Sequence, residues 1–319
     1  MIHDFIFSAN AVFPIFIVIA FGYVLRRKQY LSATAVAELN RLVFSFALPM
    51  LLFRNVYQAD FATLFDPRLV LWIVGSLILW FVLIWIFAEF FLRKQQDLIS
   101  AFVQASFRAN YAIVGLPLIA NILGDADTGK ASIAAAIVVL MFNLLSVIVL
   151  TAKNAESSGF NFALFKSIAF SIITNPSIIG VGLGIAVNLL NIPLPWIARE
   201  AVRYMAILCT PVALLAIGGS VQVSELKKYF KPALLGSAIK IIIAPIAFML
   251  ASIWLDFRGE DLLILFVMYA NPTAIVSYAM AVRMNAHAPI TATIVILTTV
   301  FSSLTLTVGI FLLRIFSLI

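Results

Sequence analysis

The chain has 319 residues, of which 64% are hydrophobic and 11% are charged, and its mean hydropathy is +1.12. About a quarter of the residues of a typical soluble domain are charged, so this composition excludes a soluble globular protein and predicts an integral membrane protein. The formal net charge is +7, which we assign to membrane topology and not to nucleic-acid binding. The single cysteine excludes an internal disulfide and a cysteine metal cluster, and we expect no cofactor.

The charged residues divide the chain into apolar runs that are long enough to cross a bilayer, since about 20 apolar residues span its hydrocarbon core. We predict ten transmembrane helices, at residues 7–25, 34–54, 69–92, 98–121, 131–152, 167–190, 197–219, 232–255, 261–283 and 288–313. No Lys or Arg precedes the first apolar run, and three basic residues follow it at Arg26, Arg27 and Lys28. This pattern is unlike a cleavable signal peptide.

The loops between these ten helices differ in basic residues. One set of alternate loops carries most of them, at Arg26, Arg27, Lys28, Arg93, Lys94, Lys153, Lys166, Lys227, Lys228, Lys231 and Arg283. Basic loops stay on the cytoplasmic side of a membrane. We therefore predict a protein of the plasma membrane (the inner membrane of a bacterium) with both termini outside.

An offset of 162 residues aligns the two halves of the chain without a gap. It places Pro14 on Pro176, Gly22 on Gly184, and the residues Glu38, Arg41 and Pro49 on Glu200, Arg203 and Pro211. Each half then holds five helices, in residues 1–155 and 156–319. Because five is an odd number, the second half enters the membrane from the opposite side, and the prediction is an inverted repeat of the kind found in secondary transporters.

The fourth and ninth predicted helices correspond under this offset, and both contain residues that interrupt a helix. The fourth has Asn110 with Pro117 further on, and the ninth has Asn271 followed directly by Pro272. Proline in a helix interior removes a hydrogen bond, and irregular backbone at membrane depth occurs where protein or a water-filled cavity surrounds it. Matching interruptions in two halves predict a substrate site near the bilayer midplane.

Several segments resemble the auxin efflux carrier family, which includes the plant auxin carriers and bacterial permeases for malate or related acids. They are LNRLVFSFALPMLLF (39–53), NYAIVGLPLI (110–119), VVLMFNLLSVIVL (138–150), PVALLAIGGSV (211–221) and NPTAIVSYAMAVRMNAHAPITATIVILTTVFSSLTL (271–306). Their order and spacing cover nearly the whole chain. The short segment from Lys153 to Lys166 stands where the larger plant carriers have a long central loop, which is typical of a compact bacterial member.

The resemblance implies an all-α membrane fold similar to NhaA and the bile-acid symporters. Helices 1, 2, 6 and 7 would form a scaffold, helices 3–5 and 8–10 a transport domain, and two copies would form a dimer through their scaffolds. In the plant carriers, asparagines beside the crossing of helices 4 and 9 bind the substrate carboxylate, and Asn110 and Asn271 are the matching positions. Asn271 is the stronger candidate, because Pro117 lies seven residues after Asn110 and the two interruptions differ.

The predicted site combines amides, cations and hydroxyl groups. Helix N-termini attract anions, and an Asn beside them adds amide donors, although it also suits a purely structural role at a kink. Arg108 and Lys240 lie deep in the fourth and eighth helices, where a charge indicates either a functional group or a side chain that reaches toward the interface. The remaining candidates line the cavity or pack between helices: Gln104, Tyr111, Thr273 and Ser277.

Two further pairs have the i,i+3 spacing of an ion pair on one helix face, Glu38 with Arg41 and Glu200 with Arg203. We predict a structural ion pair in each case, and not a proton relay. No carboxylate lies in the middle of a predicted helix, so the sequence leaves proton coupling, sodium coupling and passive uniport open.

These features predict a secondary transporter or facilitator that moves a small organic anion, such as malate or an auxin-like acid, by alternating access. The main alternative is a sodium-coupled organic-anion symporter of the bile-acid-symporter type. A channel or a membrane enzyme is less favoured, because the sequence offers neither a continuous polar pore nor a nucleophile with its base. The expected partners are the substrate, a coupling ion and membrane lipid.

Overall fold

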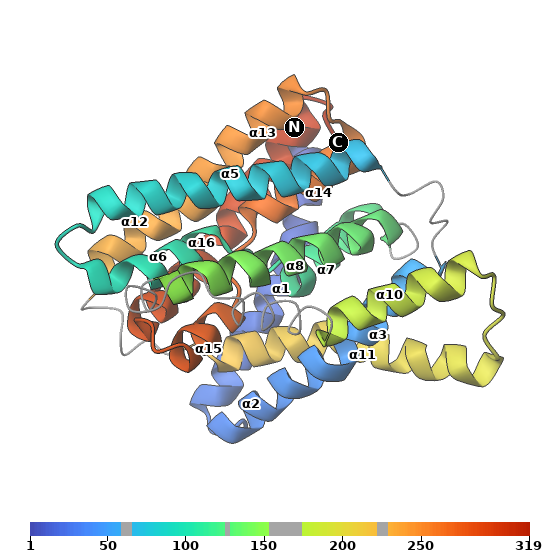
Figure 1. The fold of residues 1–319 in the computed structure, drawn as a ribbon. Helices are drawn as coiled ribbons and strands as arrows, with labels where there is room; N and C mark the ends of the chain where they lie inside the picture. The colour runs from blue at the N-terminus through green and yellow to red at the C-terminus, as the bar shows by residue number, and fades with distance from the viewer. Residues whose placement is uncertain (59–65, 125–127, 153–173, 222–228) are drawn as a thin grey trace.

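The computed structural model describes residues 1–58, 66–124, 128–152, 174–221 and 229–319. These residues form helices joined by short connections, and the described part of the chain contains no strand beyond one isolated bridge. The two ends of the chain lie close together at one end of the molecule (Figure 1). An ion pair between Arg314 and Asp4, with Nε and Oδ1 3.4 Å apart, joins the last helix to the first.

The helices follow the predicted spans in chain order. In the first half they are α1 (Ile2–Arg27), α2 (Ala33–Leu42) continuing through η1 (Val43–Ala47) into α3 (Leu48–Gln58), α5 (Pro67–Phe91), α6 (Gln96–Phe107), η2 (Tyr111–Gly115) with α7 (Leu116–Leu123), and α8 (Gly129–Ala152). In the second half they are α10 (Pro176–Leu189), α11 (Trp196–Gly219), α12 (Phe230–Ala238) continuing through η6 (Ile239–Ile243) into α13 (Ala244–Trp254), α14 (Gly259–Ala270), α15 (Val276–Arg283) and α16 (Ala288–Ile315).

Among the described residues, seven continuous helical segments are long and apolar enough to cross a membrane. They correspond to the first, second, third, fifth, seventh, eighth and tenth predicted spans, so the prediction of an all-helical membrane protein is confirmed. The fourth and ninth spans are each divided into two shorter helices. The sixth is represented by α10 alone, because residues 167–173 of that prediction lie outside the described residues.

Three π-helical turns, η1, η2 and η6, lie inside the second, fourth and eighth spans. Each ends two residues before a proline: Pro49, Pro117 or Pro245. A proline ring clashes with the carbonyl four residues before it, and in all three cases that carbonyl belongs to the central residue of the π turn. The wider turn accommodates the displaced carbonyl, so these prolines loosen their helices without ending them.

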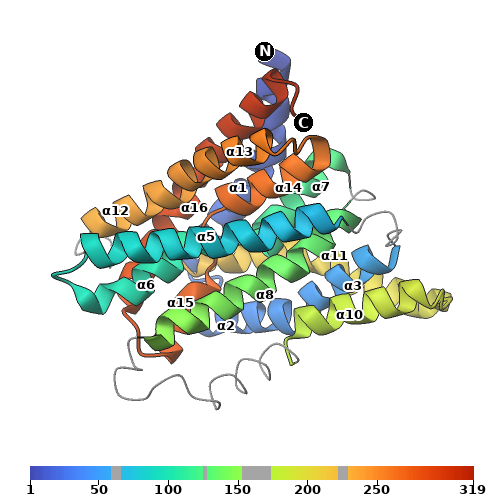
Figure 2. The same ribbon diagram turned by 45° about the horizontal axis from the view of Figure 1, so that its top comes forward.

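The helices pack in two regions. At one edge, α3, α10 and α11 lie side by side, and α1 packs along α11 (Figures 1 and 2). In the other region α5, α6 and α8 contact one another, while α12 packs on α16 and α13 on α14. The segments that follow α6 and α14 run between these two regions and position the candidate site.

Candidate functional site

The two interrupted helices meet at their interruptions. After α6 ends at Phe107 the chain is extended through Arg108, and after α14 ends at Ala270 it is extended from Asn271. Ala109 and Thr273 form an antiparallel bridge. The Asn110 amide donates to the Pro272 carbonyl at 2.8 Å, and the Ala274 amide donates to the Arg108 carbonyl at 3.4 Å. The crossing segments thus satisfy part of each other's backbone hydrogen bonding, as irregular backbone inside a membrane protein requires.

Pro272 makes this pairing one-sided. Its nitrogen has no hydrogen, so it cannot return a bond to the Asn110 carbonyl. That carbonyl accepts instead from the amides of Val114 at 3.0 Å and Gly115 at 3.4 Å, which begins the helical segment η2 and α7. The prediction that Pro117 marks the first interruption is wrong. Pro117 lies inside the helical segment formed by η2 and α7, where the π turn accommodates it, and the interruption lies at residues 108–110.

A cavity of about 1370 Å³ lies against the crossing and is open on one side. Its inner wall includes the first residues of both helices that start after the interruptions: Tyr111, Ala112 and Ile113 of η2, and Val276 of α15 with Ala274 and Ile275 before it. The first N–H groups of a helix lack partners within that helix and carry a partial positive charge. Two such ends therefore converge on one cavity.

Arg108 lies at the C-terminal end of α6 and lines the cavity. Its guanidinium donates to Asn143 Oδ1 at 2.8 Å and to Ser146 Oγ at 3.3 Å on α8, and it contacts Met280 Sδ of α15 at 2.8 Å. Because these neighbours are neutral, the positive charge is held in place without being neutralised. A guanidinium has five N–H donors, so two remain for a ligand after these three contacts.

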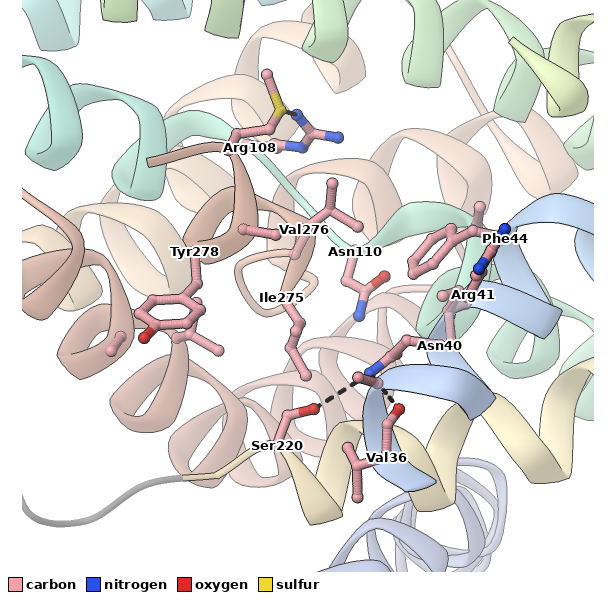
Figure 3. Close-up of a pocket in the computed structure, with 18 of the residues that line it drawn as sticks. Val36, Asn40, Arg41, Phe44, Arg108, Asn110, Ser220, Ile275, Val276 and Tyr278 are labelled. Atoms are coloured by element: carbon pink, nitrogen blue, oxygen red, sulfur yellow. Dashed lines mark hydrogen bonds between the residues drawn. The ribbon is translucent and has the colours of Figure 1, made fainter. Parts of the chain in front are cut away.

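Asn110 and Asn271 occupy different environments. Asn110 lines the cavity together with Arg41 and Arg108 (Figure 3). Asn271 is completely buried and does not line the cavity. Its Nδ2 lies against Gly115, where an added Cβ would be only 2.5 Å away. Neither Nδ2 nor Oδ1 of Asn271 has a hydrogen-bond partner among the described residues. The geometry therefore favours Asn110 for contact with a ligand, whereas the sequence favoured Asn271.

Comparison with known proteins agrees with this architecture. Residues 7–310 match the family model described as membrane transport protein. The chain belongs to this family of transporters. The match confirms the resemblance to the auxin efflux carrier family. An "Uncharacterized transporter" of Methanothermobacter thermautotrophicus is 23% identical over 95% of this chain and 97% of its own length. A "Putative malonate transporter" of Rhizobium meliloti is 27% identical over 75% of each chain.

The other predicted site residues of this membrane transport protein fall into two groups, one that lines the cavity and one that is buried away from it. Tyr111 borders the cavity, and its hydroxyl donates to the Ala131 carbonyl at 3.3 Å. Thr273 is buried behind the crossing, where its Oγ1 donates to the Ala105 carbonyl at 2.7 Å and its amide donates to Thr298 Oγ1 at 3.1 Å. These bonds fix the extended segment to α6 and α16. Gln104 and Ser277 are also completely buried and do not line the cavity.

Lys240 lies apart from the cavity of the transporter. It is 1% exposed, and its ammonium donates to the Tyr269 carbonyl at 2.7 Å. Tyr269 belongs to the last turn of α14, where carbonyl groups lack partners within the helix and the helix dipole is negative. Lys240 thus caps the carbonyl end of α14. It does not reach toward an interface, and the geometry gives it no contact with a ligand in the cavity.

The sequence interpretation missed the transporter's other cavity arginines. Five arginines line the cavity: Arg26, Arg27, Arg41, Arg108 and Arg283. No Asp or Glu belongs to its described lining. The ion pair predicted for Glu200 and Arg203 is confirmed, with Oε2 and Nη2 2.7 Å apart. The prediction of an equivalent ion pair between Glu38 and Arg41 is wrong, because Arg41 lines the cavity and forms no ion pair with Glu38. The spacing of three residues between Glu and Arg is the same in both halves, so the spacing gives no sign that only one pair forms.

Proposed function

We propose that this transporter moves a small organic anion across the plasma membrane by alternating access. The main observation that supports this proposal is the composition of the cavity. Its described lining has five arginines and no carboxylate, and two helix N-termini converge on it beside Arg108 and Asn110. Each of these groups attracts negative charge. A carboxylate also matches the planar fork of donors that an arginine presents. The malonate named for one relative is an anion of this class.

The packing supports the proposed inverted repeat of two five-helix halves. Gly22 of α1 packs against the backbone of Leu215, and Gly184 of α10 packs against Phe53, with the added Cβ of Gly184 3.0 Å from the Phe53 carbonyl oxygen. The offset of 162 residues relates the two glycines to each other and also relates Phe53 to Leu215. The two contacts are therefore counterparts. Close packing at glycine is common where membrane helices approach each other.

The crossing supports the same symmetry. The antiparallel pairing places residue 110 opposite residue 272, and these two positions are also related by the offset of 162. A two-fold axis in the membrane plane would pass between them. Such an axis is the one that relates inverted repeats in secondary transporters, whose substrates bind where the repeats meet.

The contacts at the far end of the molecule support an inward-open state. The lining of the cavity includes Arg26, Arg27 and Arg283, which lie in the loops predicted to be cytoplasmic. Toward the opposite end, the proposed transport domain is joined to the proposed scaffold. Asn121 Nδ2 donates to the Ala11 carbonyl at 2.9 Å, and Asn55 Nδ2 donates to Ser132 Oγ at 3.0 Å. Alternating access requires these contacts to separate when the cavity closes on its open side.

Uptake into proteoliposomes tests the proposal. The purified protein is reconstituted, and labelled monocarboxylates and dicarboxylates are offered with imposed proton or sodium gradients and with none. We expect saturable uptake of at least one acid, which empty liposomes lack. If no acid of either class moves, the proposed function is wrong. If uptake does not saturate and rises linearly with concentration, the protein acts as a channel.

The alternative is a sodium-coupled organic-anion symporter of the bile-acid-symporter type. The observation that favours it is the buried Asn271 Oδ1, an acceptor at the crossing with no partner among the described residues. Amide and carbonyl oxygens are ligands for hard cations. In the same uptake assay, replacing sodium by choline abolishes transport under this alternative and leaves it unchanged under sodium-independent transport.

A further inference from the structure

Arg41 is one of the five arginines that line the cavity. It lies in the last turn of α2 and lines the same cavity as Asn110, and the Phe44 ring lies between the two side chains in the view of Figure 3. Across the described residues, its guanidinium forms no ion pair or hydrogen bond. Its counterpart Arg203 instead holds Glu200 through Nε and Nη2, at 2.9 and 2.7 Å from Oε2.

The helix that carries Arg41 is fixed in place. The neighbouring Asn40 donates through Nδ2 to Ser220 Oγ at 3.3 Å, which ties α2 to the end of α11, and to the Val36 carbonyl at 3.1 Å (Figure 3). The fixed helix keeps Arg41 on the cavity wall, so binding of a ligand has to order only the side chain and not the backbone. All five N–H donors of Arg41 are available.

The cavity therefore presents arginines from two elements that are distant in the sequence. Arg108 comes from the crossing with two donors to spare, and Arg41 comes from α2 with all of its donors. An arginine binds a carboxylate best through two parallel hydrogen bonds, so each of the two guanidinium groups suits one carboxylate. An acid with a single carboxylate engages only one of them and leaves the other charge without a partner.

This inference rests on the proposed function and narrows its substrate class. We propose that Arg41 determines specificity by binding the second carboxylate of a dicarboxylate, while Arg108 and Asn110 bind the first. Arg41 thereby selects acids with two carboxylates over acids of equal chain length with one. Arg26, Arg27 and Arg283 also line the cavity, and their charge attracts anions of both kinds without distinguishing them.

The test compares Arg41→Gln with Arg203→Gln in proteoliposomes. Both changes remove one arginine from equivalent positions of the two halves, but only Arg41 lines the cavity. The substrates are pairs matched in chain length: malonate with propionate, and succinate with butyrate. For wild-type protein we expect a preference for the dicarboxylate. In Arg41→Gln we expect the apparent affinity for dicarboxylates to fall about tenfold, which is the loss of one charge-assisted contact, with monocarboxylates changed less than about twofold. Arg203→Gln should leave both classes unchanged.

A second variant and a second readout separate specificity from folding. Arg41→Lys keeps the charge but loses the paired donors, so the preference for dicarboxylates should fall to an intermediate value. Competition by unlabelled acids at fixed label gives the same ratio without depending on the amount of active protein. Equal losses for both classes in Arg41→Gln, or a wild-type protein without preference, would overturn the assignment of Arg41. Failure of wild-type protein to move any acid would instead overturn the proposed function.

Discussion

The two interruptions at the crossing have similar sequences, but the positively charged side chains near them have different environments. At the end of α6, Arg108 follows the helix and lines the cavity. At the end of α14, the cation is Lys240, which comes from η6 and is bound to the Tyr269 carbonyl out of reach of the cavity. Both charges lie near the negative end of a short helix. Only the first is also available to a ligand.

The asparagines differ in the same sense. Asn110 reaches the cavity, while Asn271 packs behind the crossing against Gly115. The inverted repeat thus supplies two similar crossing segments, and one of them provides the side chains of the proposed site. The second contributes mainly the start of α15, through Ala274, Ile275 and Val276. Symmetry of the backbone does not impose symmetry on the ligand contacts.

Removing the charge at the first interruption should have the largest effect on transport. In Arg108→Gln, the substrate loses a buried charge-assisted contact, and the cavity loses the fixed positive charge beside the crossing. We expect uptake to fall about 100-fold, which corresponds to about 2.7 kcal/mol. The measurement is the initial rate of uptake per folded protein, with folding checked by size-exclusion chromatography. Uptake within threefold of wild type would show that Arg108 serves only to join α6, α8 and α15.

The sequence predicts the helices of this protein better than the place where two of them are interrupted. Apolar runs mark the spans because the bilayer requires about 20 such residues, whatever the tertiary packing. The interruption at residues 108–110 depends on pairing with residues 271–274, which are distant in the chain. Pro117 suggested a later position because proline is a local signal, but a π turn before a proline lets the helix continue.

The site was predicted in part for a related reason. Deep polar residues mark the region of the crossing, so Arg108, Asn110 and Tyr111 could be selected from the sequence. Which side of the crossing a side chain faces depends on packing, and Asn271 and Lys240 face away from the cavity. Arg41 was assigned to Glu38 because the spacing of three residues also occurs in the second half. A spacing of three residues makes an ion pair between Glu38 and Arg41 feasible, but Arg41 lines the adjacent cavity instead.

The packing of Asn271 against Gly115 can be tested by a double-mutant cycle. In Gly115→Ala, the new Cβ would lie 2.5 Å from Asn271 Nδ2 and 2.9 Å from Val267 Cγ1. Overpacking of this kind destabilises a protein by about 1–3 kcal/mol. Because Asn271→Ala removes the nearer group, we expect the double variant to recover at least half of the loss.

The cycle requires the thermal or denaturant stability of four proteins in one detergent: wild type, Gly115→Ala, Asn271→Ala and the double variant. The matched control is Gly75→Ala on α5, where an added Cβ meets no atom within 4 Å. Additive losses in the cycle would mean that Asn271 and Gly115 do not touch, and the two asparagines would then be less different than the structure indicates.

The two asparagines can also be compared directly by transport. In Asn110→Ala, the substrate loses one amide contact, which is worth about 1–1.5 kcal/mol, so the apparent KM should rise about tenfold. In Asn271→Ala, the apparent KM should stay within about twofold of wild type, because the amide does not reach the cavity. Concentration series for both variants give the two values. A larger rise in KM for Asn271→Ala than for Asn110→Ala would restore the order that the sequence favoured.

The smallest effect is expected for Lys240→Met, which removes the charge at the second interruption. The Tyr269 carbonyl loses its donor, at a cost of about 1–3 kcal/mol. The substitution also removes a buried charge, whose desolvation is unfavourable, and methionine refills most of the volume. We therefore expect a net loss of about 1 kcal/mol in stability and an uptake rate per folded protein within about twofold of wild type. Lys231→Met, at an exposed position of α12, is the matched control and should change neither quantity. A loss of uptake as large as that of Arg108→Gln, with folding intact, would place Lys240 in the transport pathway and make the two interruptions alike.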